Sequence, residues 1–275
     1  MNISQITIGT ASWGSKINLN KSLEISSKII SLGINHFDTA PNYGGGYAHY
    51  ILNKIAKKNN ILIDTKYGQN INLTAKEIFK RFYRFTNIGS LKQSFKHIKF
   101  DRSSRSIKEY WSLEKLEAAF SSFQRELNNC TIMSFYLHSP PFGILNKEYL
   151  DKLYSFFDKK KILLGISNPD KKDLNLIIKQ FPHIKIQFSI NDFWNLKEQL
   201  DQRFKKVNIN SIFRKLIKET NDNKNDSVKF WKDFFKIVEG NSNYRLVLGI
   251  NSINSVEKLK KIICNSDNII HLDLQ

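Results

Sequence analysis

The chain contains four polar side chains that could take part together in proton transfer: Asp38, Tyr43, Lys66 and His138. A phenol has an ordinary pKa near ~10, so tyrosine alone is a poor acid at neutral pH. An ammonium beside the phenol favours phenolate, so Lys66 could lower the pKa of Tyr43. Asp38 could pair with a buried Lys66, and His138 could hydrogen-bond an oxygen of a bound molecule.

These side chains come at the ends of apolar runs, which indicates strands that end at a common site. Asp38 closes one run, Lys66 follows another, and His138 closes a third, while Tyr43 follows a proline turn beside a glycine triplet. Eight such runs predict strands: Ile6–Gly9, Ile34–Asp38, Ile61–Thr65, Thr131–Leu137, Ile162–Ile166, Ile184–Ile190, Val207–Ile212 and Tyr244–Ile250.

Helical spacing of apolar residues separates nearly all of these runs. The first helix is expected to be capped by Asn20 and to stop at Gly33; the others are predicted at Tyr47–Lys57, Leu113–Leu127, Leu145–Phe157, Asp170–Gln180, Leu196–Phe204, Val228–Val238 and Ser255–Cys264. Strand and helix in alternation predict a parallel sheet with crossover helices.

Eight such units favour an α/β fold of the (β/α)8 TIM barrel type, and a single domain over residues 1–275, because no linker divides the chain. In such a barrel the functional side chains lie at the carboxyl ends of the strands. An open, doubly wound sheet is the alternative, but no G-x-G-x-x-G follows the first strand.

Composition limits the partners and the compartment. The formal charge is +18, but the lysines are spread over the chain, which favours a solvated surface over a nucleic-acid site. The region Asn70–Ser112 mixes aromatic and basic residues as a single-strand platform would, and an irregular excursion packed on the fold is the preferred interpretation. Two distant cysteines predict neither disulfide nor metal site, and no run is long enough for a membrane span, so we expect a cytoplasmic protein.

Six short motifs then appear in a fixed order along nearly the whole chain: G-T-A-S-W-G from Gly9, H-F-D-T-A-P-N-Y-G from His36, T-K-Y-G from Thr65, L-H-S-P from Leu137, G-I-S-N from Gly165 and V-L-G-I-N-S from Val247. This ordered set resembles the aldo-keto reductase superfamily, in its bacterial form. The resemblance implies an NAD(P)H-dependent oxidoreductase that interconverts a carbonyl and an alcohol, with Tyr43 as proton donor.

Matched residue by residue, the resemblance places the catalytic tetrad on Asp38, Tyr43, Lys66 and His138. It implies that NADP(H) or NAD(H) binds without a Rossmann domain, and assigns the following residues to the cofactor: Gly9, Thr10, Ala11, Asp38, Ser167, Asn168, Gln187, Ile190, Ser211, Phe213, Gly249, Asn251 and Ser252. Within this set, Ser167, Asn168 and Gln187 match the positions that bind the carboxamide.

Three positions depart from the family pattern. Ile190 stands where an aromatic ring usually stacks on the nicotinamide, Asn251 replaces the cation that often binds a 2'-phosphate, and Lys215 replaces a glycine. Asn251 leaves the preference between the two cofactors open, and Lys258 could supply the charge. Because of these departures, an alternative function stays open: a nucleotide-binding regulatory or structural subunit with little activity. For the enzyme, the resemblance favours a sugar-like or small aldehyde substrate; the oligomeric state stays open.

Overall fold

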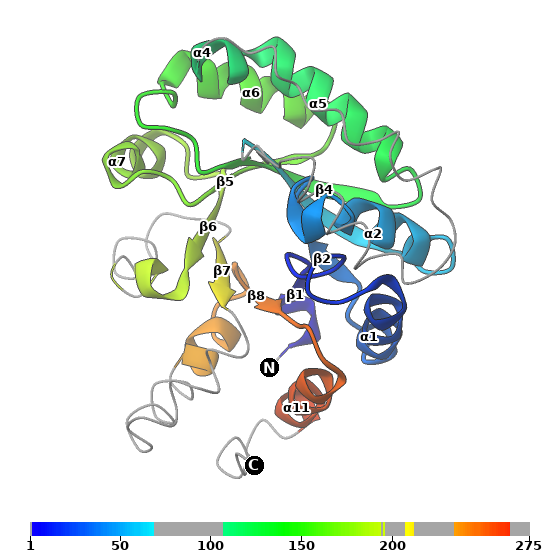
Figure 1. The fold of residues 1–275 in the computed structure, drawn as a ribbon. Helices are drawn as coiled ribbons and strands as arrows, with labels where there is room; N and C mark the ends of the chain where they lie inside the picture. Colours follow the sequence, from blue (N-terminus) through cyan, green and yellow to red (C-terminus); the bar gives the residue numbers. More distant parts are fainter. Residues whose placement is uncertain (1, 69–106, 194, 196–206, 212–233, 265–275) are drawn as a thin grey trace.

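The computed structural model describes residues 2–68, 107–193, 195, 207–211 and 234–264. Within them, eight parallel strands follow one another in chain order and close into a barrel, β1 through β8, with helices on the outside (Figure 1). The predicted (β/α)8 TIM barrel is therefore confirmed, and the open sheet is excluded by the pairing of β8 with β1.

The strands are β1 Ile6–Gly9, β2 His36–Asp38, β3 Leu62–Tyr67, β4 Thr131–His138, β5 Leu163–Ser167, β6 Lys185–Ser189, β7 Val207–Ser211 and β8 Tyr244–Gly249. The helices are α1 Leu19–Ser31, α2 Ala48–Ala56, α4 Ile107–Tyr110, α5 Leu113–Glu126, α6 Lys147–Lys159, α7 Lys171–Gln180 and α11 Ile253–Cys264, with short 3-10 turns η1 Ile3–Gln5 and η2 Tyr43–Gly45. Residues 190–193 and 234–239 are also helical.

The register of the strands aligns their carboxyl ends. Gly9 pairs with Asp38 on one side and with Gly249 on the other, and His138 pairs with Ser167. The carboxyl ends of these strands therefore lie together at one mouth of the barrel.

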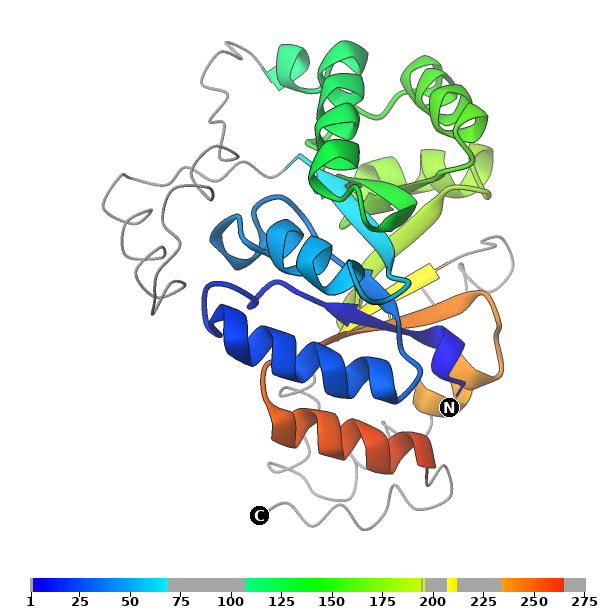
Figure 2. The same ribbon diagram turned by 90° about the vertical axis from the view of Figure 1, so that its right-hand side faces the viewer.

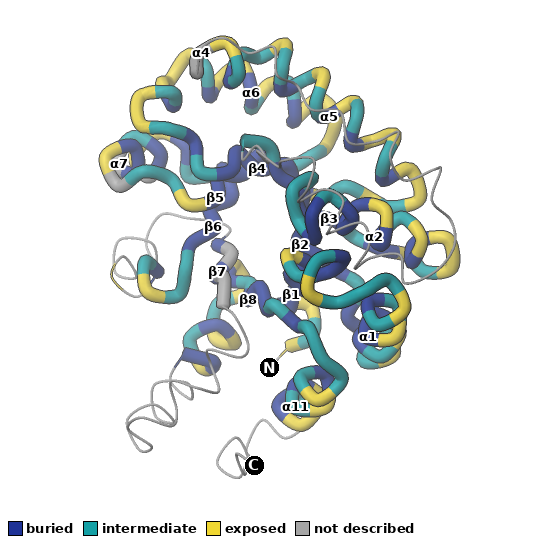
Figure 3. The backbone as a smooth tube through the Cα atoms, viewed as in Figure 1, coloured by how far each residue is buried: buried dark blue, intermediate teal, exposed yellow. Residues whose placement is uncertain are grey.

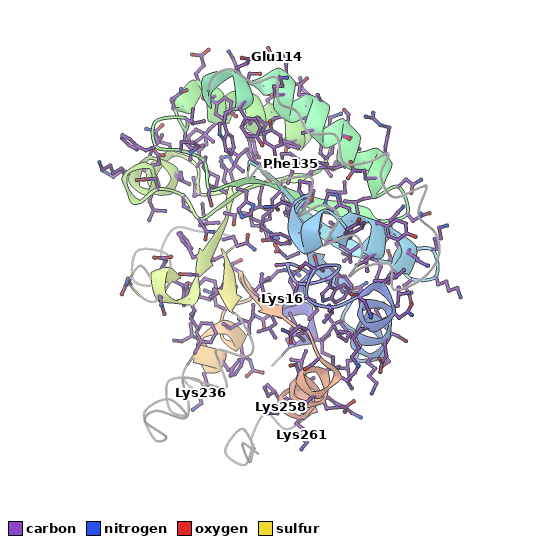
Figure 4. The ribbon with its side chains drawn as sticks, viewed as in Figure 1. Lys16, Glu114, Phe135, Lys236, Lys258 and Lys261 are labelled. Atoms are coloured by element: carbon purple, nitrogen blue, oxygen red, sulfur yellow. The ribbon has the colours of Figure 1, made fainter. Side chains whose placement is uncertain are left out.

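Helices cover the barrel through an aromatic and aliphatic layer, and their outer faces are exposed (Figure 3). Between β4 and the helices α5 and α6, the ring of Phe135 stacks on Phe157 with a centroid distance of 4.8 Å and meets Phe120 edge-on at 5.6 Å. Figure 4 labels Phe135 inside this layer, whereas Lys236 and Lys261 point away from it. Burial of large rings on this scale is the main source of fold stability.

Helix starts follow side-chain caps, and one predicted cap is wrong. Asn18, not Asn20, accepts a hydrogen bond from the Lys21 N–H at 2.9 Å, and α1 begins at Leu19. Asn146 caps α6 in the same way, so that helix begins two residues later than predicted. An asparagine in extended backbone conformation satisfies a free N–H of the first turn, which fixes the start more sharply than apolar spacing does.

Closure of the barrel brings the first and last strands together. The Gln5 amide nitrogen donates to the carbonyls of Asn241 and Tyr244, at 3.0 and 3.3 Å. Outside the strands, α1 and α11 lie side by side (Figure 2), with Lys28 Nζ 3.3 Å from a Glu257 carboxylate oxygen. The first and last strands are thus paired in the sheet, and the first and last described helices contact each other on the outside of the barrel.

Several predictions fall outside the described residues: the helix Leu196–Phe204, the irregular region up to residue 106, Phe213, Lys215 and the first part of the Val228–Val238 helix. Among the helices that are described, none has the length and apolarity that crossing a bilayer requires.

Candidate active site

The centre of the site is a buried ion pair between two neighbouring strands. Lys66 Nζ contacts Asp38 Oδ2 and lies 3.5 Å from the Thr39 carbonyl oxygen, and both charged side chains are almost fully buried. Burial opposes the charge of Lys66, but the Asp38 carboxylate and the Tyr43 phenol outweigh it and raise the pKa of Lys66 above its ordinary value. The ammonium therefore stays charged inside the barrel mouth.

Tyr43 reaches this pair because the chain folds tightly after β2. Gly44 has φ 60°, and a Cβ at this position would lie 1.5 Å from the Trp13 carbonyl oxygen, so only glycine fits. The Gly44 N–H donates to the Ala11 carbonyl at 3.0 Å. Tyr43 is thereby held with its ring centre 5.3 Å from Lys66 Nζ.

The expectation that Lys66 lowers the pKa of Tyr43 needs a correction. Burial raises the pKa of Tyr43 more than Lys66 lowers it, and the Asp38 charge adds to the rise, so the net pKa lies above the ordinary value. The phenol holds its proton at neutral pH, and Lys66 reduces the cost of losing it.

His138 lies beside the phenol of Tyr43, with ring centres 6.1 Å apart and nearly perpendicular planes. Burial, together with the nearby Lys66 charge, lowers the pKa of His138 to about 3. The imidazole is therefore neutral at neutral pH and can donate one hydrogen bond from one ring nitrogen. This arrangement suits orientation of a polar oxygen better than transfer of a proton.

Two buried polar atoms beside the pair have no hydrogen-bond partner within the described part of the chain: Ser167 Oγ and Gln187 Oε1. The other amide atom of Gln187, Nε2, donates to Asp38 Oδ2 at 2.8 Å. Buried polar atoms without partners are rare, since each costs free energy. A carboxamide carries both the donor that Gln187 Oε1 lacks and the acceptor that the Ser167 hydroxyl lacks, so these residues fit a nicotinamide.

Hydrogen bonds fix the backbone at this edge of the barrel, and open space borders Gly249. Asn168 has φ 51°, and its N–H donates to the Gln187 carbonyl at 2.9 Å. A Cβ at Gly249 would meet nothing within 4 Å. Thr10 donates from both its N–H and its hydroxyl to the Asp38 carbonyl, at 3.0 and 3.1 Å, which fixes the adjoining loop.

The loop after β8 leads into the start of α11. Ser252 Oγ accepts from the Ser255 N–H at 3.2 Å, which caps the helix, and Asn251 just before it is half-buried. A helix start favours an anion. Ser211 lies at the end of β7, Ile190 is half-buried against the core, and Phe213 falls outside the described residues.

Trp13, which follows β1, belongs to the hydrophobic core. Trp13 is fully buried, and its indole N–H donates to the Ile250 carbonyl at 2.9 Å. Sequence reasoning missed two neighbours of the pair: the Gln187 contact with Asp38, and Tyr136, whose ring centre lies 5.6 Å from Lys66 Nζ. Tyr136 lies two positions before His138 on β4, a spacing that puts both side chains on one face of a strand.

Comparisons with known proteins identify a family and a fold for this chain. The model of the aldo/keto reductase family matches residues 5–219. A search of curated proteins returned no significant match.

Solved structures with the same fold include a glycerol dehydrogenase from Gluconobacter oxydans, with 16% identity, a TM-score of 0.61 and coverage of 94% of this chain and 86% of that one. An aldo-keto reductase from Bacillus halodurans in its holo form has 15% identity, the same TM-score of 0.61 and coverage of 94% and 86%. An aldo-keto reductase from Klebsiella pneumoniae in complex with NADPH has 13% identity, a TM-score of 0.56 and coverage of 92% and 82%.

The fold and the strand-end cluster define a (β/α)8 barrel with a polar site at its carboxyl mouth. This chain belongs to the aldo/keto reductase family. Membership supports, in general terms, an NAD(P)-dependent oxidoreductase that acts on small carbonyl compounds.

Proposed function

We propose that this protein reduces a carbonyl to an alcohol with NADPH or NADH, and catalyses the reverse reaction, with Tyr43 as the proton donor to the carbonyl oxygen. The observation that carries the proposal is the convergence of Asp38, Tyr43, Lys66 and His138 at one mouth of the barrel. The domain is proposed to span residues 1–275.

Tyr43 suits the donor role because it holds its proton until a stronger base forms beside it. Its pKa is raised by burial. An alkoxide is a far stronger base than phenolate, so the proton moves from Tyr43 Oη when negative charge develops on the substrate oxygen. Lys66 then stabilises the phenolate, and Asp38 keeps Lys66 from being an isolated buried cation.

His138 directs the substrate oxygen toward Tyr43. Because its pKa of about 3 keeps the ring neutral, it offers a hydrogen bond without competing as an acid. The two rings lie at 85° to each other, so an oxygen placed between them could face both.

The nicotinamide cofactor would supply the hydride when bound. Ser167 and Gln187 would hold its carboxamide through the two atoms that have no partner within the described residues, with Asn168 beside them. Further residues proposed to line the cofactor are Gly9, Thr10, Ala11, Ile190, Ser211, Phe213, Gly249, Asn251 and Ser252. The capped start of α11 would face a phosphate.

A small, polar, sugar-like or aldehyde substrate is proposed. Support comes from the neighbour named a glycerol dehydrogenase. The alternative is a nucleotide-binding subunit with little activity. It is disfavoured because all four tetrad side chains lie close together: Lys66 contacts Asp38, its Nζ is 5.3 Å from the Tyr43 ring centre, and that centre is 6.1 Å from the His138 ring centre.

The test has two stages. Purified protein is titrated with NADPH and with NADH, and quenching of tryptophan fluorescence reports binding; a panel of small aldehydes and sugars is then assayed for cofactor oxidation. Saturable binding with turnover is expected. Binding without turnover across the panel would favour the subunit, and no binding of either cofactor would refute both.

A further inference from the structure

The Lys66 ammonium is bordered by two aromatic rings as well as by its counter-ion. Its Nζ contacts Asp38 Oδ2, lies 5.3 Å from the ring centre of Tyr43 and lies 5.6 Å from the ring centre of Tyr136. Asp38 and Tyr43 belong to the proposed tetrad, whereas Tyr136 has no part in the function proposed above. Because an aromatic face attracts a cation within about 6 Å of its centre, Tyr136 is a further binding partner of this ammonium.

Tyr136 is uncharged and completely buried. It lies on β4 two positions before His138, a spacing that puts both side chains on one face of the strand. Burial raises the pKa of its phenol well above the ordinary value, and the charges of Asp64 and Asp38 add to the rise. The phenol therefore keeps its proton at neutral pH, and its attraction for Lys66 comes from the ring. Branched aliphatic side chains ordinarily fill the interior of such a barrel, so a ring here calls for an explanation.

The neighbouring strand is shaped to hold this ring. Gly165 on β5 pairs with Tyr136 in the sheet, and a Cβ at Gly165 would lie 2.4, 2.5 and 2.9 Å from three ring carbons. Any other residue at this position would therefore force the ring to move. The place of the Tyr136 ring is thus set by the backbone of β5.

A second ion pair packs against the same ring. Lys185 Nζ lies 5.6 Å from the Tyr136 ring centre and 2.9 Å from Asp64 Oδ2. Asp64 and Lys66 are two positions apart on β3, so their side chains leave the same face of the strand. A flexible lysine stem could therefore reach more than one carboxylate in this interior. The uncharged ring fills the space beside both ammoniums, and each lysine keeps its own carboxylate: Asp64 for Lys185 and Asp38 for Lys66.

From this geometry we propose that Tyr136 is a positioning residue for Lys66. Its ring confines the ammonium to the place where it contacts Asp38 and lies near Tyr43, so that the positive charge can stabilise the phenolate when Tyr43 gives up its proton. The effect on catalysis rests on the proposed function, whereas the contact between the ring and the ammonium does not.

The first measurement follows the Lys66 ammonium by NMR, without any need for turnover. The protein is labelled at lysine Nζ with the NMR-active nitrogen isotope, and Lys66→Arg identifies the Lys66 signal by its loss. A proton held over an aromatic face resonates upfield, so the Lys66 ammonium protons should move downfield in Tyr136→Leu and stay in place in Tyr136→Phe. In the wild type these protons should show nuclear Overhauser contacts with an aromatic ring that disappear in Tyr136→Leu.

The second measurement is kinetic. Tyr136→Leu and Tyr136→Met should lower kcat about tenfold, the loss expected for a desolvated contact between a cation and a ring, with the dissociation constant of the cofactor nearly unchanged. Tyr136→Phe keeps the ring and should keep kcat. Methionine is unbranched and fills irregular spaces, so Tyr136→Met provides the test where Tyr136→Leu does not fold.

Tyr244→Leu is the matched control. Tyr244 is a buried tyrosine on another strand, β8, and its ring meets Phe193 edge-on with a centroid distance of 5.3 Å. The substitution removes a large ring from the core, so it should lower the melting temperature as Tyr136→Leu does. It should leave the Lys66 signal and kcat unchanged.

An unmoved Lys66 signal in Tyr136→Leu and Tyr136→Met would overturn the proposal, as would an absence of the nuclear Overhauser contacts in the wild type. An equal loss of kcat in Tyr136→Phe would assign the effect to the hydroxyl, and an equal loss in Tyr244→Leu would show general loosening of the barrel; either result would also overturn it. A wild type without turnover would refute the proposed function, while the NMR result still decides this inference.

Discussion

Gln187 donates a hydrogen bond to Asp38 across the interior of the barrel, with Nε2 2.8 Å from Oδ2. The two residues are 149 positions apart in sequence, on β6 and β2, which lie on opposite sides of the eight-stranded barrel. One amide thus joins the two halves of the proposed site: Nε2 donates to the Asp38 carboxylate, and Oε1 is the atom proposed to bind a carboxamide. Cofactor binding and proton transfer would therefore share a side chain.

Tyr43→Phe should lower turnover at least ~100-fold with cofactor affinity nearly unchanged, because it removes the proton donor and leaves the ring in place. Tyr47→Phe, at a buried tyrosine four residues further along the chain, is the matched control and should retain turnover. The measurement is kcat with the best carbonyl of the panel, alongside fluorescence titration. Unchanged turnover in Tyr43→Phe would refute the assignment.

Ser167→Ala should weaken cofactor binding about tenfold without destabilising the free protein. Its Oγ is buried and has no partner within the described residues, so the free protein loses no hydrogen bond, while the complex loses one worth roughly 0.5–1.5 kcal/mol. Ser26→Ala is the matched control, because Ser26 Oγ donates to the Leu23 carbonyl at 2.8 Å. That control should lower the free energy of unfolding and leave binding alone; the opposite pattern would count against a carboxamide at Ser167.

Asn251→Arg should raise the preference for NADPH over NADH about tenfold. The new guanidinium would stand just before the Ser252 cap of α11, where a 2'-phosphate is proposed to bind, and hydrogen bonds to charged groups contribute about 1.5–3 kcal/mol. The ratio of the two dissociation constants is the measurement. Asn243→Arg adds the same charge before β8, at the other end of that strand, and should leave the ratio unchanged.

Acid should destabilise the folded protein through His138. Its pKa is lowered to about 3 in the folded state, against 6.5 for the ordinary group, so the unfolded chain binds one more proton between these values. Stability from this group is complete above pH 6.5 and is lost as the pH falls toward 3, with a slope of up to ~1.4 kcal/mol per pH unit. Chemical unfolding of the wild type and His138→Gln across this window should differ by that slope; parallel curves would show that His138 titrates normally.

Gly165→Ala should cost about 1–3 kcal/mol of unfolding free energy, since its Cβ would overlap the Tyr136 ring. Adding Tyr136→Leu to Gly165→Ala should recover part of the loss, because the smaller side chain frees the space. Thermal unfolding of the two single variants and the double variant measures the coupling. Strict additivity would mean that the ring does not need this glycine.

Much of the fold could be predicted because the strand and helix signals are local. The strand ends at Asp38 and His138 and the order of the six motifs predict the barrel, and they place the residues of the proposed site at its carboxyl mouth. The first residues of the helices are harder to predict from the sequence. Asn18 and Asn20 are both plausible caps by residue type, and only the backbone conformation selects Asn18.

The electrostatic balance at Tyr43 could not be predicted, because it depends on how deeply the phenol is buried as well as on which cation lies near it. The buried charged side chains Asp64 and Lys185 could have been predicted from the sequence to lie inside the barrel, because Asp64 precedes Lys66 by two residues and Lys185 precedes Gln187 by two. The period of two along a strand carries that signal. Which of these charges meet across the barrel depends on the closure and register of strands that are distant in sequence.

The pairing of β8 with β1, fastened by Gln5, has a consequence for synthesis on the ribosome. The first strand emerges early, but the edge it offers to β8 stays open until more than two hundred further residues have been translated. An open strand edge is a site for wrong pairing with other chains. Nascent chains stalled before Tyr244 should therefore depend on chaperones far more than chains released after Gly249.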